Sequence, residues 1–139
     1  MQTILRILDR AGGYRPTLYL RVEKPPYMVL VIEAMPEPEP LGLPAISIAH
    51  YGEQNGDLMR DPEMCFELAK PISGKIICDP YYWRNDYVGV EQFSRAIVRG
   101  HYVALSQLHE QHLHFATAWD RNLNLQGFAE AFTDAAIRG

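Results

Sequence analysis

Residues 45–68, AISIAHYGEQNGDLMRDPEMCFEL, decide the fold because they predict two β-strands joined by a tight turn. Apolar side chains recur at alternate positions on both sides of Asn55-Gly56, as in a half-buried strand. Asn-Gly is a strong hairpin signal because a type I′ turn needs positive φ at both central positions. We therefore expect strands over 45–51 and 63–68. Pro62 would start the second strand, where its missing N–H does no harm.

The second strand of this hairpin has two chemically different faces. Met64, Phe66 and Leu68 would be buried, and Glu63 and Glu67 would lie on the other face. Working outward, alternation and apolar runs predict further strands on both sides of the hairpin. These strands are expected at 17–23, 27–35, 75–79 and 86–93, with the aromatic stretch 80–85 as the turn between the last two.

The sequence predicts helices near both ends of the chain. Thr3 can cap a short helix that Gly12-Gly13 ends. From His101 the apolar residues step by three and four, which predicts one long helix. After Gly127, residues 128–137 predict a final short helix. The apolar stripe of the long helix comprises Leu105, Leu108, His112, Phe115, Trp119 and Leu123.

This order of elements predicts an α+β fold in a single domain spanning 1–139. An antiparallel sheet of about five or six strands would carry a short N-terminal helix and a long C-terminal helix on one face. The proline-rich segment 36–44 is expected to be an exposed loop.

The composition narrows the class of protein. Hydrophobic residues make up 47% of the chain and charged residues 22%, as in a soluble globular protein. A net charge of −4 argues against a general nucleic-acid binder, which would present a basic face. No apolar run is long enough to cross a membrane, and no export signal is recognisable, so a cytoplasmic location is expected. In that location, Cys65 and Cys78 are expected to be reduced and buried.

The hairpin carries more polar residues than a turn needs. Three interpretations stay open: a structural turn, a binding surface, or a catalytic site in which His50 is the base and Glu53 or Asp57 orients it. A calcium loop is excluded, because placing Gly56 at its sixth position would put Tyr51 first. The candidate binding residues here are His50, Tyr51, Glu53, Asp57, Arg60, Asp61 and Glu63.

A second polar and aromatic cluster follows at 81–87. Tyrosine and arginine are the side chains that dominate interface hot spots, so this cluster suits recognition of a partner. Tyr82, Trp83 and Arg84 could instead contact single-stranded nucleic acid by stacking. Both clusters are expected to meet at one edge of the sheet. The candidate binding residues of this cluster are Tyr81, Tyr82, Arg84, Asn85 and Asp86.

The histidines of HEQHLH, residues 109–114, do not form a zinc-protease motif, because the first two are three positions apart rather than four. His109 and His112 could share a helix face around a metal. However, His112 lies in the apolar stripe, which favours a hydrogen-bonded core histidine, with His109 and His114 facing solvent. No metal and no cofactor are therefore expected.

Three segments carry a resemblance to a known family: LPAISIAHYGEQNGDLMRDPEMCFE at 43–67, PYYWRNDYVGVEQ at 80–92 and FATAWDRNLNLQGF at 115–128. Together they resemble an uncharacterised family of small bacterial proteins found mainly on plasmids and integrative elements. The resemblance implies a cytoplasmic accessory protein. It transfers no activity, cofactor or catalytic residue to this chain.

The function expected from the sequence is a non-enzymatic binding or interaction module that recognises an unknown protein or small molecule through the two clusters. The alternative is a small hydrolase-like enzyme that uses His50 with Glu53 or Asp57, and Arg60 to bind an anionic substrate. Neither nucleic acid nor a membrane is expected as a partner, and a homodimer is left open.

Overall fold

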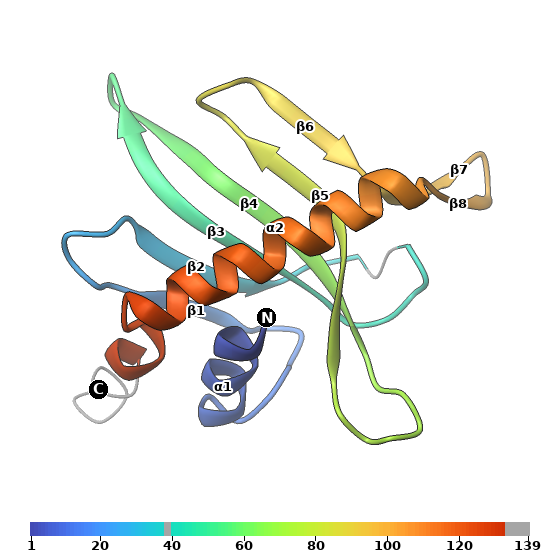
Figure 1. Cartoon of the computed structure of the whole chain (residues 1–139), viewed down its shortest axis with the longest axis horizontal. Coiled ribbons are helices and arrows are strands. Elements are labelled where there is room, and N and C mark those ends of the chain that lie inside the picture. Colours follow the sequence, from blue (N-terminus) through green and yellow to red (C-terminus); the bar gives the residue numbers. More distant parts are fainter. Residues whose placement is uncertain (38–39, 133–139) are drawn as a thin grey trace.

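The computed structural model describes residues 1–37 and 40–132, and it has the predicted α+β architecture (Figure 1). Its main sheet has six strands in chain order, and each strand pairs antiparallel with the next. A separate two-stranded ribbon, β7 and β8, precedes the long helix. The strands are β1 Tyr19–Val22, β2 Val29–Ala34, β3 Ala45–Gln54, β4 Asp57–Ala69, β5 Ile77–Asn85, β6 Val90–Phe93, β7 Arg95–Val98 and β8 His101–Ala104.

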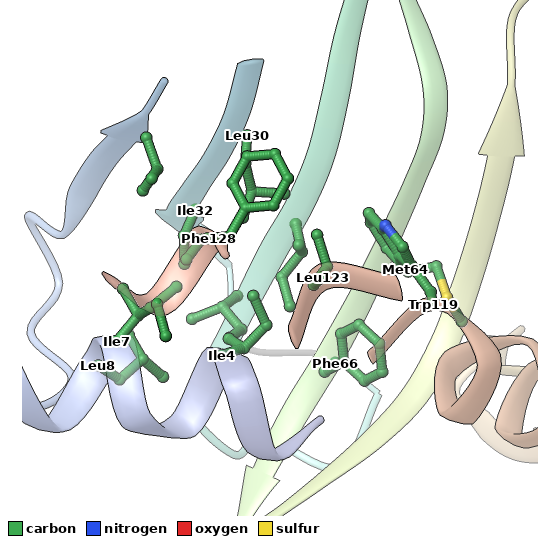
Figure 2. Packing of buried hydrophobic residues seen from close by; sticks show 14 of the residues in the cluster. Ile4, Ile7, Leu8, Leu30, Ile32, Met64, Phe66, Trp119, Leu123 and Phe128 are labelled. Atoms are coloured by element: carbon green, nitrogen blue, oxygen red, sulfur yellow. The ribbon is translucent and has the colours of Figure 1, made fainter. Parts of the chain in front are cut away.

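Both helices pack on the same face of the main sheet. Helix α1 spans Gln2–Arg10, and α2 spans Ser106–Leu125 and crosses the sheet diagonally (Figure 1). Their apolar sides meet alternate residues of β2, β3 and β4, which form one core (Figure 2). No helix of the described residues lies on the opposite face of the sheet, and we call this face the open face. The core includes Ile4, Ile7, Leu8, Leu30, Ile32, Ile46, Ile48, Met64, Phe66, Trp119, Leu123 and Phe128.

The glycine pair ends α1 as predicted. The Gly13 amide donates to the Leu8 carbonyl at 2.8 Å, and Gly12 takes a positive φ, as in a Schellman cap. The prediction that Thr3 caps the helix is wrong, because the helix begins at Gln2 and Thr3 is buried inside it. The Thr3 amide instead donates to Asp120 Oδ1 of α2 at 2.8 Å. A carboxylate from the other helix therefore accepts one of the amides that have no acceptor within α1.

The central hairpin is confirmed, and its strands are longer than predicted. Asn55 and Gly56 have φ values of 52° and 86°, which fit the expected turn. Pro62 does not start β4 but lies inside it, which corrects the prediction. The register shifts there, so that Asp61 and Pro62 together face His50, and a proline is tolerated in such a bulge.

The segment 80–85 is not a turn. It belongs to β5, and the chain turns over 86–89 instead. Aromatic residues are common in strands because they pack well on a pleated surface, and neighbouring residues of this strand pack on opposite faces of the sheet. Trp83 packs toward α2, while Tyr82 faces the open side.

The long helix begins at Ser106 rather than His101. Residues 95–104 form the β7–β8 ribbon, whose turn at Arg99-Gly100 has φ values of 52° and 79°. Leu105 is therefore outside the helix and exposed, whereas His112, Trp119 and Leu123 of the predicted stripe are buried. Residues 128–132 are helical, and the rest of the predicted final helix lies outside the described residues.

The remaining expectations concern the proline-rich loop and the cysteines. The described part of 36–44 has no regular structure, but Pro40 in it is buried, so the loop is only partly exposed. Cys65 and Cys78 are both free; the first is buried and the second half-buried. Among the described residues, no helix is both long and apolar enough to cross a membrane.

Candidate functional site

Asp86 joins the two predicted clusters. Its Oδ2 accepts the backbone N–H of Arg60 at 2.8 Å, and its Oδ1 accepts Arg84 Nε at 2.6 Å. Its own amide donates to the Arg60 carbonyl at 2.9 Å. Burial alone would raise the pKa of Asp86, but the hydrogen bonds from the Arg60 amide and the Arg84 side chain lower it. The β3–β4 and β5–β6 hairpins are therefore locked together through one ionised carboxylate.

A second set of contacts joins the same hairpins on the helix side of the sheet. Asn85 Nδ2 donates to Asp61 Oδ1 at 2.6 Å, and Asn85 Oδ1 accepts the Tyr87 amide at 2.9 Å. The Tyr87 hydroxyl lies so close to Gly52 that a Cβ at residue 52 would collide with it. Several residues around the β3–β4 turn thus have a structural role. Their partners lie about 25 to 35 residues further along the chain, in the β5–β6 hairpin.

The open face is hollowed into two adjoining pockets whose shared wall is Arg60 and Arg84. The first pocket has a volume of about 500 Å³ and the second about 420 Å³, and neither is an enclosed cavity. The first is also lined by Tyr19, Arg21, Val29, Val31, Glu33, Tyr51, Leu58 and Asp86. The second is also lined by Met35, Pro36, Glu37, Glu63, Cys65, Tyr81, Tyr82, Glu91 and Phe93.

Ordered side chains form the floor of the second pocket. The Tyr82 hydroxyl donates to Glu91, and its ring lies 4.8 Å from that of Phe93. Burial, followed by the hydrogen bond to Glu91, raises the pKa of Tyr82. Glu63 accepts a hydrogen bond from the Ser47 hydroxyl and lies 3.6 Å from Arg60 Nε. That Arg60 Nε is buried and has no hydrogen-bond partner among the described residues.

The structure does not bring the proposed catalytic residues together. His50 is 8% exposed and faces the helices, with its ring 5.5 Å from that of Trp119 and 5.4 Å from that of Phe128. Its Nδ1 lies 3.1 Å from the Met28 carbonyl. Glu53 and Asp57 flank the hairpin turn and are exposed. This geometry gives no support to a catalytic couple of His50 with Glu53 or Asp57.

The aromatic residues of β5 are also divided between two faces. Tyr82 and Arg84 lie on the open face, whereas the Trp83 ring packs 5.7 Å from Phe115 of α2. Tyr81 is buried beneath the guanidinium of Arg95. Tyr82, Trp83 and Arg84 therefore do not form one stacking surface for a single strand of nucleic acid.

The histidines of α2 make protein contacts. His112 is buried; its Nδ1 lies 2.9 Å from Ser94 Oγ and its Nε2 lies 3.0 Å from Gln92 Oε1, which confirms a hydrogen-bonded core histidine. His109 was expected to face solvent but pairs with Asp79 Oδ1 at 2.6 Å. Within residues 1–37 and 40–132, no three His, Cys, Asp or Glu side chains could jointly hold a metal.

A buried ion pair joins β4 and β7, and it was not predicted from the sequence. Glu67 was expected on the more polar face of its strand, yet it is fully buried. Its Oε1 accepts Arg95 Nη1 at 2.7 Å, and its Oε2 accepts the amides of Leu41 and Leu43. Arg95 also donates to backbone carbonyls of β5. A glutamate alternating with apolar residues and a lone arginine 28 positions away give no local signal for such a pair.

The fold and the open face define a small α+β domain: a six-stranded meander with helices on one side and a polar groove on the other. The chain belongs to the family described as a domain of unknown function (DUF6908), whose model matches residues 2–129. Comparisons with curated proteins and with solved structures gave no match.

The two buried histidines should make folding sensitive to mild acid. Burial lowers the pKa of both His50 and His112 below the ordinary value of 6.5, and nearby His109 lowers that of His112 further. The unfolded chain therefore binds more protons below about pH 6.5, so stability is full above that pH and declines as the pH falls. Urea midpoints measured from pH 7.5 to pH 5 should decrease steadily.

The matched variants for this test are His112→Gln and His114→Gln. Replacing the buried histidine should flatten the pH dependence, while replacing exposed His114 should leave it unchanged. Equal slopes in the wild type and His112→Gln would show that His112 does not contribute.

Proposed function

We propose that the protein is a non-enzymatic binding module that holds an acidic segment of a partner protein against the open face of its sheet. One observation carries this proposal: Arg60 and Arg84 form the common wall of two adjoining pockets, and Asp86 fixes the Arg60 backbone and the Arg84 side chain. The Arg84 guanidinium is thus held by Asp86 before any partner arrives, and the Arg60 side chain extends from a fixed backbone and lies 3.6 Å from Glu63. This order reduces the entropy lost on binding.

The chemistry of the first pocket suits a carboxylate next to an apolar side chain. Guanidinium groups bind carboxylates through charge-assisted hydrogen bonds. Arg21 adds a third cation to this pocket, and Val31 and Leu58 add apolar surface. Arginine and tyrosine are also the residues most often responsible for binding energy at protein interfaces.

The charges of the second pocket repel an acidic ligand, so the two ends of the groove differ in what they can bind. The second pocket is lined by the acids Glu37, Glu63 and Glu91 together with Arg60 and Arg84. In the first pocket three arginines, Arg21, Arg60 and Arg84, are accompanied only by the acids Glu33 and Asp86. A carboxylate would be repelled from the second pocket and attracted to the first, so only one orientation of the segment is favoured. Both pockets open on the surface of the sheet, which suits an extended protein segment better than a buried small molecule.

We also propose a biological role, as an accessory protein of a mobile genetic element. The resemblance of 43–67, 80–92 and 115–128 to proteins of plasmids and integrative elements supports an accessory factor of a mobile element. Such a factor would act in the bacterial cytoplasm through this groove.

The proposal can be tested with a random heptapeptide display library. Peptides selected on the wild-type protein should contain Asp or Glu beside an apolar residue. The double variant Arg60→Gln/Arg84→Gln should bind these peptides at least about tenfold more weakly, because two charge-assisted contacts are lost. Binding to the wild type should also weaken as salt is added.

The matched control is Arg121→Gln, which makes the same chemical change at an exposed position of α2. This variant should bind the selected peptides as the wild type does, and thermal melting should show that all variants fold. Failure to select any peptide, selection of peptides without acids, or equal binding by the double variant would contradict the proposal.

A further inference from the structure

The β7–β8 ribbon exposes apolar side chains on both of its faces. It stands beside the start of α2, apart from the main sheet (Figure 1). Ile97 faces Tyr102 on one side, while Val98 and Val103 lie on the other, and these four side chains are 39–51% exposed. Strands that are apolar on both faces are normally covered on both faces, and an isolated two-stranded ribbon is only marginally stable in water.

Within the described part of the chain, no strand pairs with the outer edge of β8. The Leu105 amide donates to the Ser94 carbonyl at 2.8 Å, so this residue directs its backbone groups inward. Because bonding alternates along an antiparallel strand, Val103 also points toward β7, whereas Tyr102 and Ala104 direct their N–H and C=O groups outward. No other described residue bonds to this edge through its backbone.

We propose that β8 pairs antiparallel with β8 of a second copy, so that two ribbons form a four-stranded sheet around a two-fold axis. Tyr102 of each chain would exchange hydrogen bonds with Ala104 of the other. The two Val103 side chains would face each other across the axis as a non-hydrogen-bonded pair. The edge is therefore complementary to itself.

Charge favours this antiparallel arrangement. Residues 92–109 contain no Asp or Glu, and the ribbon tip carries Arg99 and His101. With Val103 on the axis, the two Arg99 positions lie eight residues apart along the strand direction, or about 26 Å. This separation exceeds the Debye length of about 8 Å, so the basic tips do not repel each other strongly.

The apolar surface beside the β8 edge indicates how large the dimer interface is. A standard interface buries about 800 Å² per partner, of which about 65% is apolar in homodimers, or roughly 500 Å². Phe93 and Leu105, at the base of the ribbon, are 51% and 52% exposed. Pairing at the β8 edge covers parts of Tyr102, Val103 and Leu105, which are 45%, 39% and 52% exposed, so this interface is smaller than the standard one.

The first test is the mass of the protein in solution. Sedimentation over a dilution series should show a dimer for the wild type and a monomer for Val103→Lys, because two lysines would face each other across the axis. Val88→Lys makes the same change at another exposed valine, in the β5–β6 turn, and should remain dimeric. A monomeric wild type throughout the series, or a dimeric Val103→Lys, would overturn the proposal.

A cross-linking test does not depend on how well the lysine variant folds. Facing residues in a non-hydrogen-bonded pair have Cα atoms about 4.5 Å apart, which permits a disulfide. Val103→Cys should therefore form a covalent dimer on mild oxidation, and Val88→Cys should not. The native thiols should not interfere, because burial raises the pKa of Cys65 and raises that of Cys78 to about 11. Equal cross-linking of both variants would contradict the proposed axis.

Discussion

Arg95→Ala should lower the free energy of unfolding by about 3–5 kcal/mol, as expected when one partner of a buried ion pair is removed. Arg95 and Glu67 are 3% and 0% exposed, and their side chains meet at 2.7 Å. Without the guanidinium, the Glu67 carboxylate would stay buried with only the two loop amides. Two backbone carbonyls of β5 would also lose their donors. Urea unfolding followed by circular dichroism measures the effect.

Two further variants separate the buried charge from the packing. Glu67→Leu/Arg95→Met removes both charges and keeps much of the volume, so it should recover most of the lost stability. Arg21→Ala removes the arginine of an exposed pair with Glu23 and should change stability little. If Arg95→Ala unfolds at the wild-type urea concentration, the pair does not stabilise the fold.

The elements that could be predicted from the sequence are those defined by neighbouring residues. The central hairpin follows from Asn55-Gly56 and the alternation beside it, and the end of α1 follows from Gly12-Gly13. The β7–β8 ribbon was missed because Arg99-Gly100 is a weaker turn signal than Asn-Gly, although both residues adopt positive φ.

The wrong predictions for Pro62 and Thr3 share another physical cause, which is that the partners of these residues are distant in the chain. Pro62 is accommodated inside β4 only because the register with β3 shifts at His50. Thr3 needs no capping role because Asp120 of α2 accepts its amide. A single sequence does not reveal pairings of this kind.

In the candidate site, too, some features could be predicted from neighbouring residues and others depend on residues distant in the chain. The residues around the turn were recognised as an unexplained polar excess, and the two clusters were expected to meet. They do meet, because β4 and β5 are neighbours and Asp86 and Asn85 reach Arg60 and Asp61. The sequence did not show that His50 faces the core while Arg60 faces the open side. That depends on the bulge in the hairpin.

Trp119→Ala should also destabilise the protein by about 3–5 kcal/mol, the usual cost of deleting a large aromatic side chain from a core. Trp119 is 5% exposed and lies where α2 crosses the sheet (Figure 2). Its ring is 5.5 Å from that of His50 and 6.2 Å from that of Phe115. The alanine variant would leave a cavity between the helix and the strands, lined by these rings and by Met64. Chemical denaturation gives the magnitude.

Trp119→Phe distinguishes packing from hydrogen bonding at this position. A buried indole N–H normally has a partner, but Trp119 Nε1 has none among the described residues. Phenylalanine would therefore remove an unsatisfied donor along with part of the ring. The lost apolar contact and the removed polar group act in opposite directions, so the variant should cost well under half as much as alanine. If Trp119→Phe is as unstable as Trp119→Ala, the indole N–H must bind a partner in solution, and packing alone does not explain the role of Trp119.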